Sequence, residues 1–338
     1  MIRKLLRTLG WVAASILTAT SLFLFYATRP GISAKRLPTA GIVHFKENSP
    51  PLPEETHELT VLTYNLGYGA GKKNNRPEVL SREEVERNLA AMARELRSQN
   101  ADLIFLQELD FDSQRSFGID QFRYLADKVA LPYAAYVLTW NKKYVAWPYW
   151  PPQTHFGRVV SGQAVFSRFP ILSQQLIYFE KPAENPFWYN WFYLDHIVQH
   201  LWLKIGDREA SVYNLHLEAF STATRREQLE KIGKLIKADP AAIRIAAGDY
   251  NLASHIEAGR KDNERDTEDL LPKFAAVTGL SNAEGKRIFY SMPSWNAYKK
   301  IDHIFFSPGL KLLDSGNLAG IEASDHLAVW AKFKRPLP

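Results

Sequence analysis

The sequence of 338 residues contains no cysteine. The chain therefore cannot form a disulfide, use a thiolate nucleophile or bind zinc through sulfur, and its redox compartment stays undetermined. It also lacks internal repeats and low-complexity tracts. Apolar residues make up 46% of the chain and charged residues 23%, a composition that suits one large α/β domain or two small ones.

Acidic residues are absent from the first 36 positions, which hold six of the 42 basic residues. Residues 37–338 consequently carry as many acidic as basic side chains. The net charge of +6 and the pI near 9.2 therefore belong to the N-terminal segment. They are not evidence for a nucleic-acid-binding face, although a local basic patch is still compatible with them.

Residues 8–28 carry no charge and are mostly apolar. At about 1.5 Å per residue, a helix of this length crosses a hydrocarbon core of about 30 Å. Arg3, Lys4 and Arg7 precede it, so the N-terminus is expected in the cytoplasm. A cleaved signal peptide is the alternative, but its apolar region is usually about 7–15 residues long. We therefore expect residues 1–28 to be a retained membrane anchor, with the body exported in either case.

The rest of the chain divides into a linker and a body. Five prolines between positions 30 and 53 predict an irregular linker over residues 29–57, followed by a single body over 58–338. Helices are expected over 81–98, 117–130, 222–238 and 266–278. The first of these helices has a clear start, because Ser81 can cap it and Glu84 follows three residues later.

Several apolar or alternating runs predict strands: 59–65, 102–106, 159–166, 171–179, 197–205, 209–215, 243–247, 301–306 and 327–333. The runs 159–166 and 171–179 are expected to pair, and 197–205 is expected to form a hairpin with 209–215. Many of the strands alternate instead of being apolar throughout, which favours partly antiparallel sheets. The sequence therefore predicts a mixed α/β (α+β) fold with two packed sheets and helices on the outside.

Polar residues recur where the predicted strands end. They are Asn65, Glu108, His216, Asp249, Asn251, Asp302, Asp325 and His326. Strand ends at one edge of a sheet lie close together in space, and hard oxygen ligands of this kind suit Mg²⁺ or Mn²⁺ better than zinc. A divalent ion, histidines that exchange protons and amides that position oxygens are what phosphoester hydrolysis requires.

Each of these residues also has a simpler interpretation. Gly248-Asp249-Tyr250-Asn251 suits a turn after a buried strand. Glu108 could be a solvated strand end, and His216 a hydrogen-bonded structural histidine. Asp325-His326 could be an ion pair of small energetic value. The joint occurrence of all of them, in one order, favours a site.

With these motifs, the sequence resembles the endonuclease/exonuclease/phosphatase superfamily, the deoxyribonuclease-like metal-dependent phosphoesterases. The resemblance covers residues 59–333. Its motifs are Thr63-Tyr64-Asn65, Leu106-Gln107-Glu108, Gly162-Gln163-Ala164-Val165-Phe166-Ser167, Asn214-Leu215-His216-Leu217, Gly248-Asp249-Tyr250-Asn251, Ile301-Asp302-His303-Ile304 and Ser324-Asp325-His326. The resemblance implies a four-layer α/β/β/α sandwich, here behind an N-terminal transmembrane helix. It also implies that Glu108 is the principal Mg²⁺ ligand, with Asn65 beside it and Asp325 in the same set.

The resemblance implies catalytic roles as well. Asp249 orients or deprotonates the attacking water, Asn251 contacts the scissile phosphate, and His216 hydrogen-bonds the phosphate. Asp302 accepts a hydrogen bond from His326. His326 is then either the general base or, as imidazolium, the stabiliser of the developing charge. The implied reaction is in-line attack of water on phosphorus without a covalent intermediate.

The core motifs do not distinguish among the DNA, RNA, inositol phosphate and sphingomyelin-type lipid substrates of this superfamily. The unusual feature of this sequence is aromatic, because six of its nine tryptophans lie in residues 140–202, in and around the aromatic loops 147–152 and 185–193. Such loops can enter a bilayer interface, stack on bases, or pack on each other and on the sandwich.

A membrane-anchored, exported and net-neutral body with aromatic loops favours a lipid-linked or headgroup phosphodiester, because a non-specific nuclease usually needs more phosphate-neutralising charge. A nuclease acting on nucleic acid is the alternative. In that case basic residues near the motifs would line a phosphate groove: Lys142, Lys143, Arg158, Arg168, Lys299 and Lys300. A binding module without catalysis is the third reading, and it is disfavoured because every position of the motif set is filled. No protein partner is evident.

Overall fold

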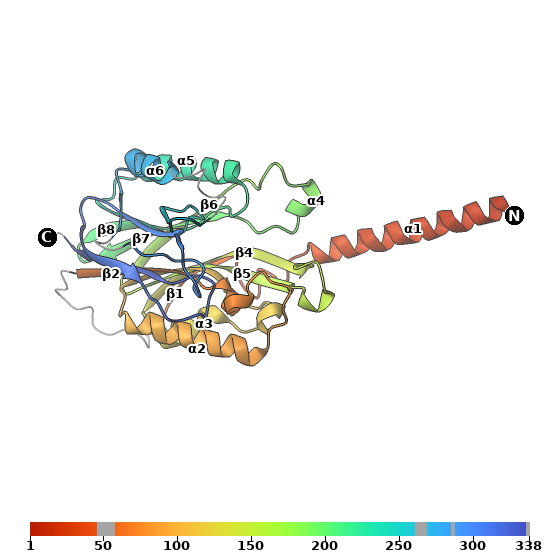
Figure 1. Ribbon diagram of the computed structural model, residues 1–338, viewed down its shortest axis with the longest axis horizontal. Coiled ribbons are helices and arrows are strands. Elements are labelled where there is room, and N and C mark those ends of the chain that lie inside the picture. Colours follow the sequence, from red (N-terminus) through yellow and green to blue (C-terminus); the bar gives the residue numbers. More distant parts are fainter. Residues whose placement is uncertain (46–57, 261–268, 285–287, 336–338) are drawn as a thin grey trace.

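The computed structural model describes residues 1–45, 58–260, 269–284 and 288–335. Two large β-sheets lie in the centre of the body, and helices cover their outer faces (Figure 1). A long helix, α1, projects from one end of the body (Figure 1). The body is thus the four-layer α/β/β/α arrangement that the sequence predicts.

The first sheet has seven strands in the order β1-β4-β5-β3-β2-β15-β14. They are β1 (Ala40–His44), β4 (Tyr133–Val145), β5 (Gly157–Ser167), β3 (Leu103–Asp110), β2 (Glu58–Asn65), β15 (Val329–Lys334) and β14 (Lys311–Asn317). Only β2 and β3 pair in parallel. Their carboxyl ends therefore meet at one edge of the sheet, where Asn65 and Glu108 lie.

The second sheet has six strands in the order β11-β13-β9-β8-β7-β6. They are β11 (Ser281–Asn282), β13 (Asp302–Phe306), β9 (Ile243–Asp249), β8 (Arg208–His216), β7 (Ile197–Ile205) and β6 (Ile171–Tyr178). The β8–β9 pair is parallel, whereas β13 runs antiparallel to β9. A separate short pair consists of β10 (His255–Ile256) and β12 (Lys299–Lys300).

The helices are α1 (Ile2–Ala27), α2 (Arg82–Ser98), α3 (Gln121–Val129), α4 (Phe187–Asn190), α5 (Thr222–Ala238) and α6 (Leu270–Thr278). Helices α2 and α3 cover the first sheet, and α5 and α6 cover the second (Figure 1). The Ser81 side chain accepts from the backbone N–H of Glu84, and the Glu84 carboxylate accepts from that of Ser81. This reciprocal cap explains why α2 begins where the sequence predicts.

Side-chain alternation builds the core from three apolar layers. On β2, Leu59 and Val61 face the second sheet, while Leu62 and Tyr64 face α2 and α3. On β9, Ile245 faces the first sheet. Every second side chain of each strand therefore points into the layer between the two sheets, and the polar residues at the ends of the same strands continue this alternation.

Helix α1 differs from the other helices. Its 26 residues have an apolar stretch of mean hydropathy 1.7, and the side chains of that stretch are not buried in the protein. By length and composition α1 could cross a membrane, although a signal sequence would have the same properties.

Two expectations about local structure were wrong. Residues 29–57 are not wholly irregular, because β1 pairs with β4 at the edge of the first sheet; residues 46–57 lie outside the described part. The runs 159–166 and 171–179 do not pair: β5 belongs to the first sheet and β6 to the second, so the intervening segment crosses between sheets. The helix expected over 266–278 is confirmed as α6 from Leu270 to Thr278, and residues 266–268 lie outside the described part.

Candidate active site

Four polar side chains at strand ends point into the space between the two sheets, as the alternating apolar side chains of the same strands do. They are Asn65 on β2, His216 on β8, Asp249 on β9 and Asp302 on β13. Strand register brings three of them side by side, because Asp249 pairs with His216 on one flank and with Asp302 on the other. Asn65 reaches across from the other sheet, and its Nδ2 donates to Asp249 Oδ2 at 3.0 Å. The two sheets therefore meet in a polar cluster at this edge.

Gly248 makes the close approach of β8 and β9 feasible. Its φ is 150°, and a Cβ at this position would lie 1.9 Å from the Leu215 carbonyl oxygen. Any side chain here would push β9 away from β8 and separate Asp249 from His216. Glycine before Asp249 is thus a packing requirement of the site.

Asn251 lies differently from the expectation. Asp249 and Asn251 would share one side only if the backbone stayed extended, but Asn251 has φ 49° in the left-handed region. Its backbone N–H donates to Asp249 Oδ1 at 2.9 Å, and its Nδ2 donates to the Leu217 carbonyl at 2.9 Å. The structure therefore shows Asn251 bracing the Asp249 carboxylate, and its contact with phosphate stays a prediction.

A bulge in β3 turns Glu108 into the site. The pairing of β3 with β5 shifts between Leu106 and Leu109, and Glu108 has φ 51°. Gln107 takes the inward position below it and donates from Nε2 to Asn214 Oδ1 at 2.7 Å, which links the two sheets. Glu108 Oε1 lies 3.5 Å from His216 Nε2.

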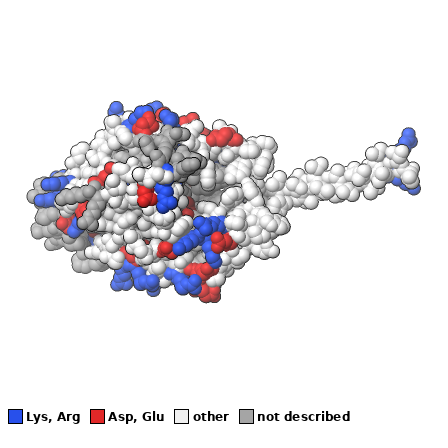
Figure 2. Space-filling view, viewed as in Figure 1, with Lys and Arg blue, Asp and Glu red and all other residues white. Residues whose placement is uncertain are grey.

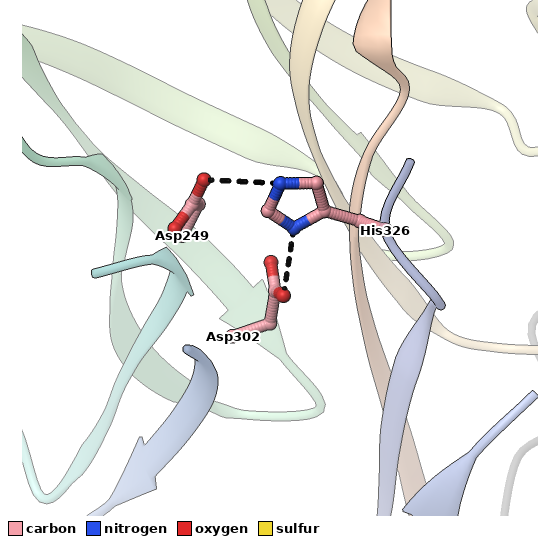
Figure 3. A group of neighbouring side chains, drawn as sticks. All are labelled: Asp249, Asp302 and His326. Carbon is pink, nitrogen blue, oxygen red and sulfur yellow. Dashed lines mark hydrogen bonds and ion pairs between the residues drawn. The ribbon is translucent and has the colours of Figure 1, made fainter. Parts of the chain in front are cut away.

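His326 lies between two carboxylates (Figure 3). Its Nδ1 donates to Asp302 Oδ2 at 2.9 Å, as the sequence predicts, and its Nε2 lies 3.7 Å from Asp249 Oδ2. Burial alone would lower the pKa of His326, but the charges of Asp302 and Asp249 outweigh it and raise the pKa well above its ordinary value. The two carboxylates therefore favour the imidazolium form of His326.

A second carboxylate pair lies beside this cluster. Asn74 Nδ2 donates to Glu108 Oε2 at 3.3 Å and to both oxygens of Asp325 at 3.2 Å. Burial and then the negative charge of Asp325 raise the pKa of Glu108 to about 7. Two carboxylates, Asp325 buried and Glu108 partly buried, that converge on one amide nitrogen create a site where a cation is stabilising.

The two groups differ in what they could hold. Asp249, Asp302 and His326 have ligand atoms within 4.8 Å of one another. However, the Nδ1 of His326 is already bonded to Asp302, so this group is better suited to holding a proton than a metal. Glu108 and Asp325 offer hard carboxylate oxygens without such a bond to a histidine Nδ1, and they fit Mg²⁺ or Mn²⁺.

His216 rests on a buried pair that the sequence motifs did not include. His196 Nδ1 donates to the His216 carbonyl at 2.9 Å, and His196 Nε2 lies 3.0 Å from Glu218 Oε2. Burial raises the pKa of Glu218, but His196 outweighs it and the pKa falls to about 2. Burial lowers the pKa of His216 to about 4, so His216 is neutral.

Asn74 carried no sequence signal. It lies in the loop between β2 and α2, outside any periodic run.

The basic residues expected to line a phosphate groove were misjudged in part. Arg168 pairs with Asp102 and Arg158 with Asp112, each at 2.6 Å, and Lys300 is only 1% exposed. None of the six basic residues lines the pocket into which the site opens.

That pocket has a volume of about 680 Å³. Glu108 and His216, 3.5 Å apart, are part of its lining, and aromatic side chains from β4 and from the segment around α4 form most of its walls. Phe23 and Leu24 of α1 line it as well. The site therefore opens into a largely apolar space beside the end of the N-terminal helix.

The chain belongs to the endonuclease/exonuclease/phosphatase family, whose sequence model matches residues 62–326. Members of this family are divalent-metal-dependent hydrolases of phosphoesters. No curated protein sequence matches the chain at a significant level.

Solved structures of the family share the fold. An endonuclease/exonuclease/phosphatase from Beutenbergia cavernae DSM 12333 is 19% identical with a TM-score of 0.59, over 82% of this chain and 72% of that one. D. rerio TDP2 complexed with a single-strand DNA product is 16% identical with a TM-score of 0.54, over 82% of this chain and 98% of that one. A mannosyl-6-phosphatase from Bacteroides thetaiotaomicron VPI-5482 is 18% identical with a TM-score of 0.51, over 81% of this chain and 99% of that one. At these identities the likeness shows the fold alone.

Proposed function

We propose that the chain is a phosphoester hydrolase, with phosphodiesters favoured, that uses Mg²⁺ or Mn²⁺, is anchored in a membrane by α1 and acts on a lipid-borne phosphoester. The observation that carries this proposal is the pocket. Its lining includes both the neighbouring polar side chains Glu108 and His216 and the apolar Phe23 and Leu24 of α1. A substrate that reaches this site beside a membrane helix has ready access from the bilayer. The body would then lie outside the cytoplasm, because Arg3, Lys4 and Arg7 favour a cytoplasmic N-terminus.

Glu108 and Asp325 would hold the metal ion, with Asn65 beside them. The charge of the bound ion would stabilise negative charge on a phosphoryl oxygen. The convergence of both carboxylates on Asn74 Nδ2 supports this assignment, because that nitrogen donates to three of their oxygens. The side-chain Oδ1 of Asn65 accepts from the Gly67 N–H at 3.0 Å, which fixes the orientation of the amide.

The protonation states suggest a division of work. Asp249 Oδ2 lies within 3.9 Å of the Nε2 atoms of both His216 and His326, and it would accept a proton from the attacking water. The water oxygen bonds to phosphorus, the bond from phosphorus to the leaving oxygen breaks, and the leaving oxygen keeps the electron pair and takes up a proton. His326, as imidazolium, would stabilise charge on the phosphoryl oxygens instead of acting as the base.

Nucleic acid is the second candidate substrate. One structural neighbour, D. rerio TDP2, is described in complex with a single-strand DNA product. In the present chain the pocket beside the site is walled mainly by aromatic and aliphatic side chains, and Arg158 and Arg168 are bound to carboxylates. These features favour a lipid over a polyanion.

The test is a substrate panel with the full chain in lipid nanodiscs and Mg²⁺. It would compare phospholipid, plasmid DNA, RNA and bis(4-nitrophenyl) phosphate. We expect hydrolysis that EDTA abolishes, that prefers the lipid, and that Glu108→Gln reduces by at least about 10²-fold. Glu322→Gln, which changes an exposed carboxylate nearby, is the matched control. Faster cleavage of DNA or RNA than of lipid would overturn the lipid assignment, and full activity of Glu108→Gln would overturn the metal site.

A further inference from the structure

The pocket is larger than a phosphate group requires. Its volume of about 680 Å³ lies within the range of about 300–1,000 Å³ that is typical of sites for small organic ligands. Glu108 and His216 lie next to each other in the lining, with Oε1 and Nε2 3.5 Å apart, whereas Trp140, Trp147 and Phe192 are among its many aromatic residues. A ligand that fills this space therefore has a polar end and a long apolar part.

The end of α1 is attached firmly enough to serve as a wall. The Asn141 side chain on β4 exchanges two hydrogen bonds of 3.0 Å with the backbone of Ile32. The Lys143 N–H donates to the Arg29 carbonyl at 2.7 Å, and the Phe23 ring meets the Tyr144 ring edge-on at 5.7 Å between centroids. A helix that served only as a tether would not need these contacts with the strand that lines the pocket.

The opposite wall is also fixed in place. Trp140 Nε1 donates to the Phe192 carbonyl at 2.6 Å, which joins β4 to the segment that carries α4. Tyr193 donates its hydroxyl proton to Glu218 at 2.8 Å, and Lys181 Nζ donates to the Tyr193 carbonyl at 2.8 Å. The aromatic walls are therefore formed before any ligand enters, which lowers the entropic cost of binding.

The outer surface beside the pocket suits a bilayer. Trp150 is 76% exposed and Phe187 is 72% exposed, and both lie in the aromatic loops. In the space-filling view few charged side chains lie next to the base of α1, whereas Lys, Arg, Asp and Glu gather on the body farther from the helix (Figure 2). With α1 in a membrane, this uncharged surface would meet the lipid.

From these features we infer that the pocket binds one hydrocarbon chain of the lipid substrate, with Phe23 and Leu24 of α1 forming part of the wall. The chain enters from the bilayer and lies between α1 and the aromatic loops, while its phosphoester lies at Glu108 and His216. This inference rests on the proposed function, since it assigns the apolar part of the same substrate. It makes α1 a component of the substrate site.

Photocrosslinking tests the location of the chain without requiring catalysis. The probe is dodecyl phosphate with a diazirine at the far end of its chain, added to the full protein in nanodiscs. We expect crosslinks to peptides that contain Phe23, Leu24 or residues 140–149, and we expect unlabelled dodecyl phosphate to compete them away. Labelling that does not saturate, or that falls only on the outer surface of α1, would overturn the inference.

Chain-length selectivity tests whether the pocket is used during turnover. The substrates are ethyl and dodecyl 4-nitrophenyl phosphate, and the measured quantity is the ratio of their kcat/KM values. Each methylene buried in the pocket raises kcat/KM by up to about fourfold, which corresponds to about 0.8 kcal/mol. Leu24→Ala removes wall contacts and Ala146→Trp fills the pocket, so both should lower the dodecyl-to-ethyl ratio, Ala146→Trp by at least about tenfold.

Leu22→Ala is the matched control for Leu24→Ala, because Leu22 is a 64% exposed leucine of the same helix that does not line the pocket. The Leu22→Ala variant should keep the wild-type dodecyl-to-ethyl ratio, because the partitioning of both substrates into the bilayer is the same as with the wild type. An unchanged ratio in Leu24→Ala and Ala146→Trp would overturn the inference. Saturable crosslinking at the pocket without hydrolysis of any phosphoester would refute the proposed function and leave the chain site standing.

Discussion

Leu24 of the N-terminal helix and His216 at the carboxyl end of β8 line the same pocket. One belongs to the segment that could cross a membrane, and the other to the polar cluster between the two sheets. The hydrogen bonds of Asn141 and Lys143 with the chain that follows α1 fix this relationship. A membrane around α1 would therefore lie close to the site, and the predictions below start from that arrangement.

The side of the membrane can be tested because the chain has no cysteine of its own. Ser173→Cys introduces one thiol at an exposed position of β6. If the body is exported, a membrane-impermeant maleimide should label this variant in intact cells. Ile2→Cys, at the other end of α1, should react only after the membrane is permeabilised. The opposite labelling pattern would contradict the export of the body.

The aromatic loops are expected to enter the lipid interface, where Trp is favoured. Trp150 is 76% exposed and Trp191 is 46% exposed. Replacing both by Phe keeps the apolar contact but removes two fluorophores, so brominated lipids should quench a smaller share of the remaining tryptophan fluorescence. Trp330→Phe, on β15, is the control and should not lower that share. An unchanged share in the double variant would show that these loops stay out of the lipid.

Asn74 is expected to hold the two proposed metal ligands in position. It donates to Glu108 and Asp325, so Asn74→Ala leaves these two carboxylates without their common donor. Loss of such a supporting contact typically costs about 10–100-fold in metal affinity or activity. We expect the Mg²⁺ concentration for half-maximal hydrolysis to rise by at least about tenfold on that basis. Lys72→Ala, on the same loop, should leave it unchanged, and an unaltered Mg²⁺ titration of Asn74→Ala would contradict the assignment.

Asp302 is expected to act through His326. Its Oδ2 accepts from His326 Nδ1, so Asp302→Asn removes the charge that favours the imidazolium. If the imidazolium stabilises the transition state, kcat should fall by about 10²–10⁴-fold while KM changes little. Asp314→Asn, at an exposed position of β14, is the control. A rise in KM at constant kcat would instead indicate a role in binding.

Much of this site could be predicted from the sequence because strand alternation is a local property. Asn65, Asp249 and Asp302 keep the parity of the apolar residues that precede or follow them, so their inward direction follows from the pattern. The start of α2 could be predicted for the same reason, since its capping residues Ser81 and Glu84 are only three residues apart. Features of this kind require no knowledge of how distant segments meet.

The features that could not be predicted depend on contacts between segments that are distant in the sequence. Asn74 belongs to a loop without periodicity, and only the fold brings it to Glu108 and Asp325. The strand β1 lies within the proline-rich segment 29–57 and is stabilised by pairing with β4. The pocket combines α1, β4 and the segment around α4, which are far apart in the chain. The bulge at Glu108 likewise appears only in the pairing of β3 with β5.

Glu95 gives the clearest prediction about stability. It lies on the buried face of α2, is 6% exposed, and its Oε2 has no hydrogen-bond partner among the described residues. Burial raises its pKa from 4.5 to about 8. Between these pH values the folded protein binds a proton that the unfolded chain releases, so the free energy of unfolding falls as the pH rises.

Glu95→Gln removes this titration. The variant should therefore unfold at a higher temperature than the wild type at pH 8, with a gain of roughly 2–4 kcal/mol in the free energy of unfolding. At pH 4 the difference should almost vanish, because Glu95 is then protonated in both states. Glu86→Gln, on the exposed face of the same helix, serves as the control and should change little at either pH. Thermal unfolding followed by circular dichroism measures both variants, and equal Tm values for Glu95→Gln and wild type at pH 8 would mean that Glu95 is ionised without cost.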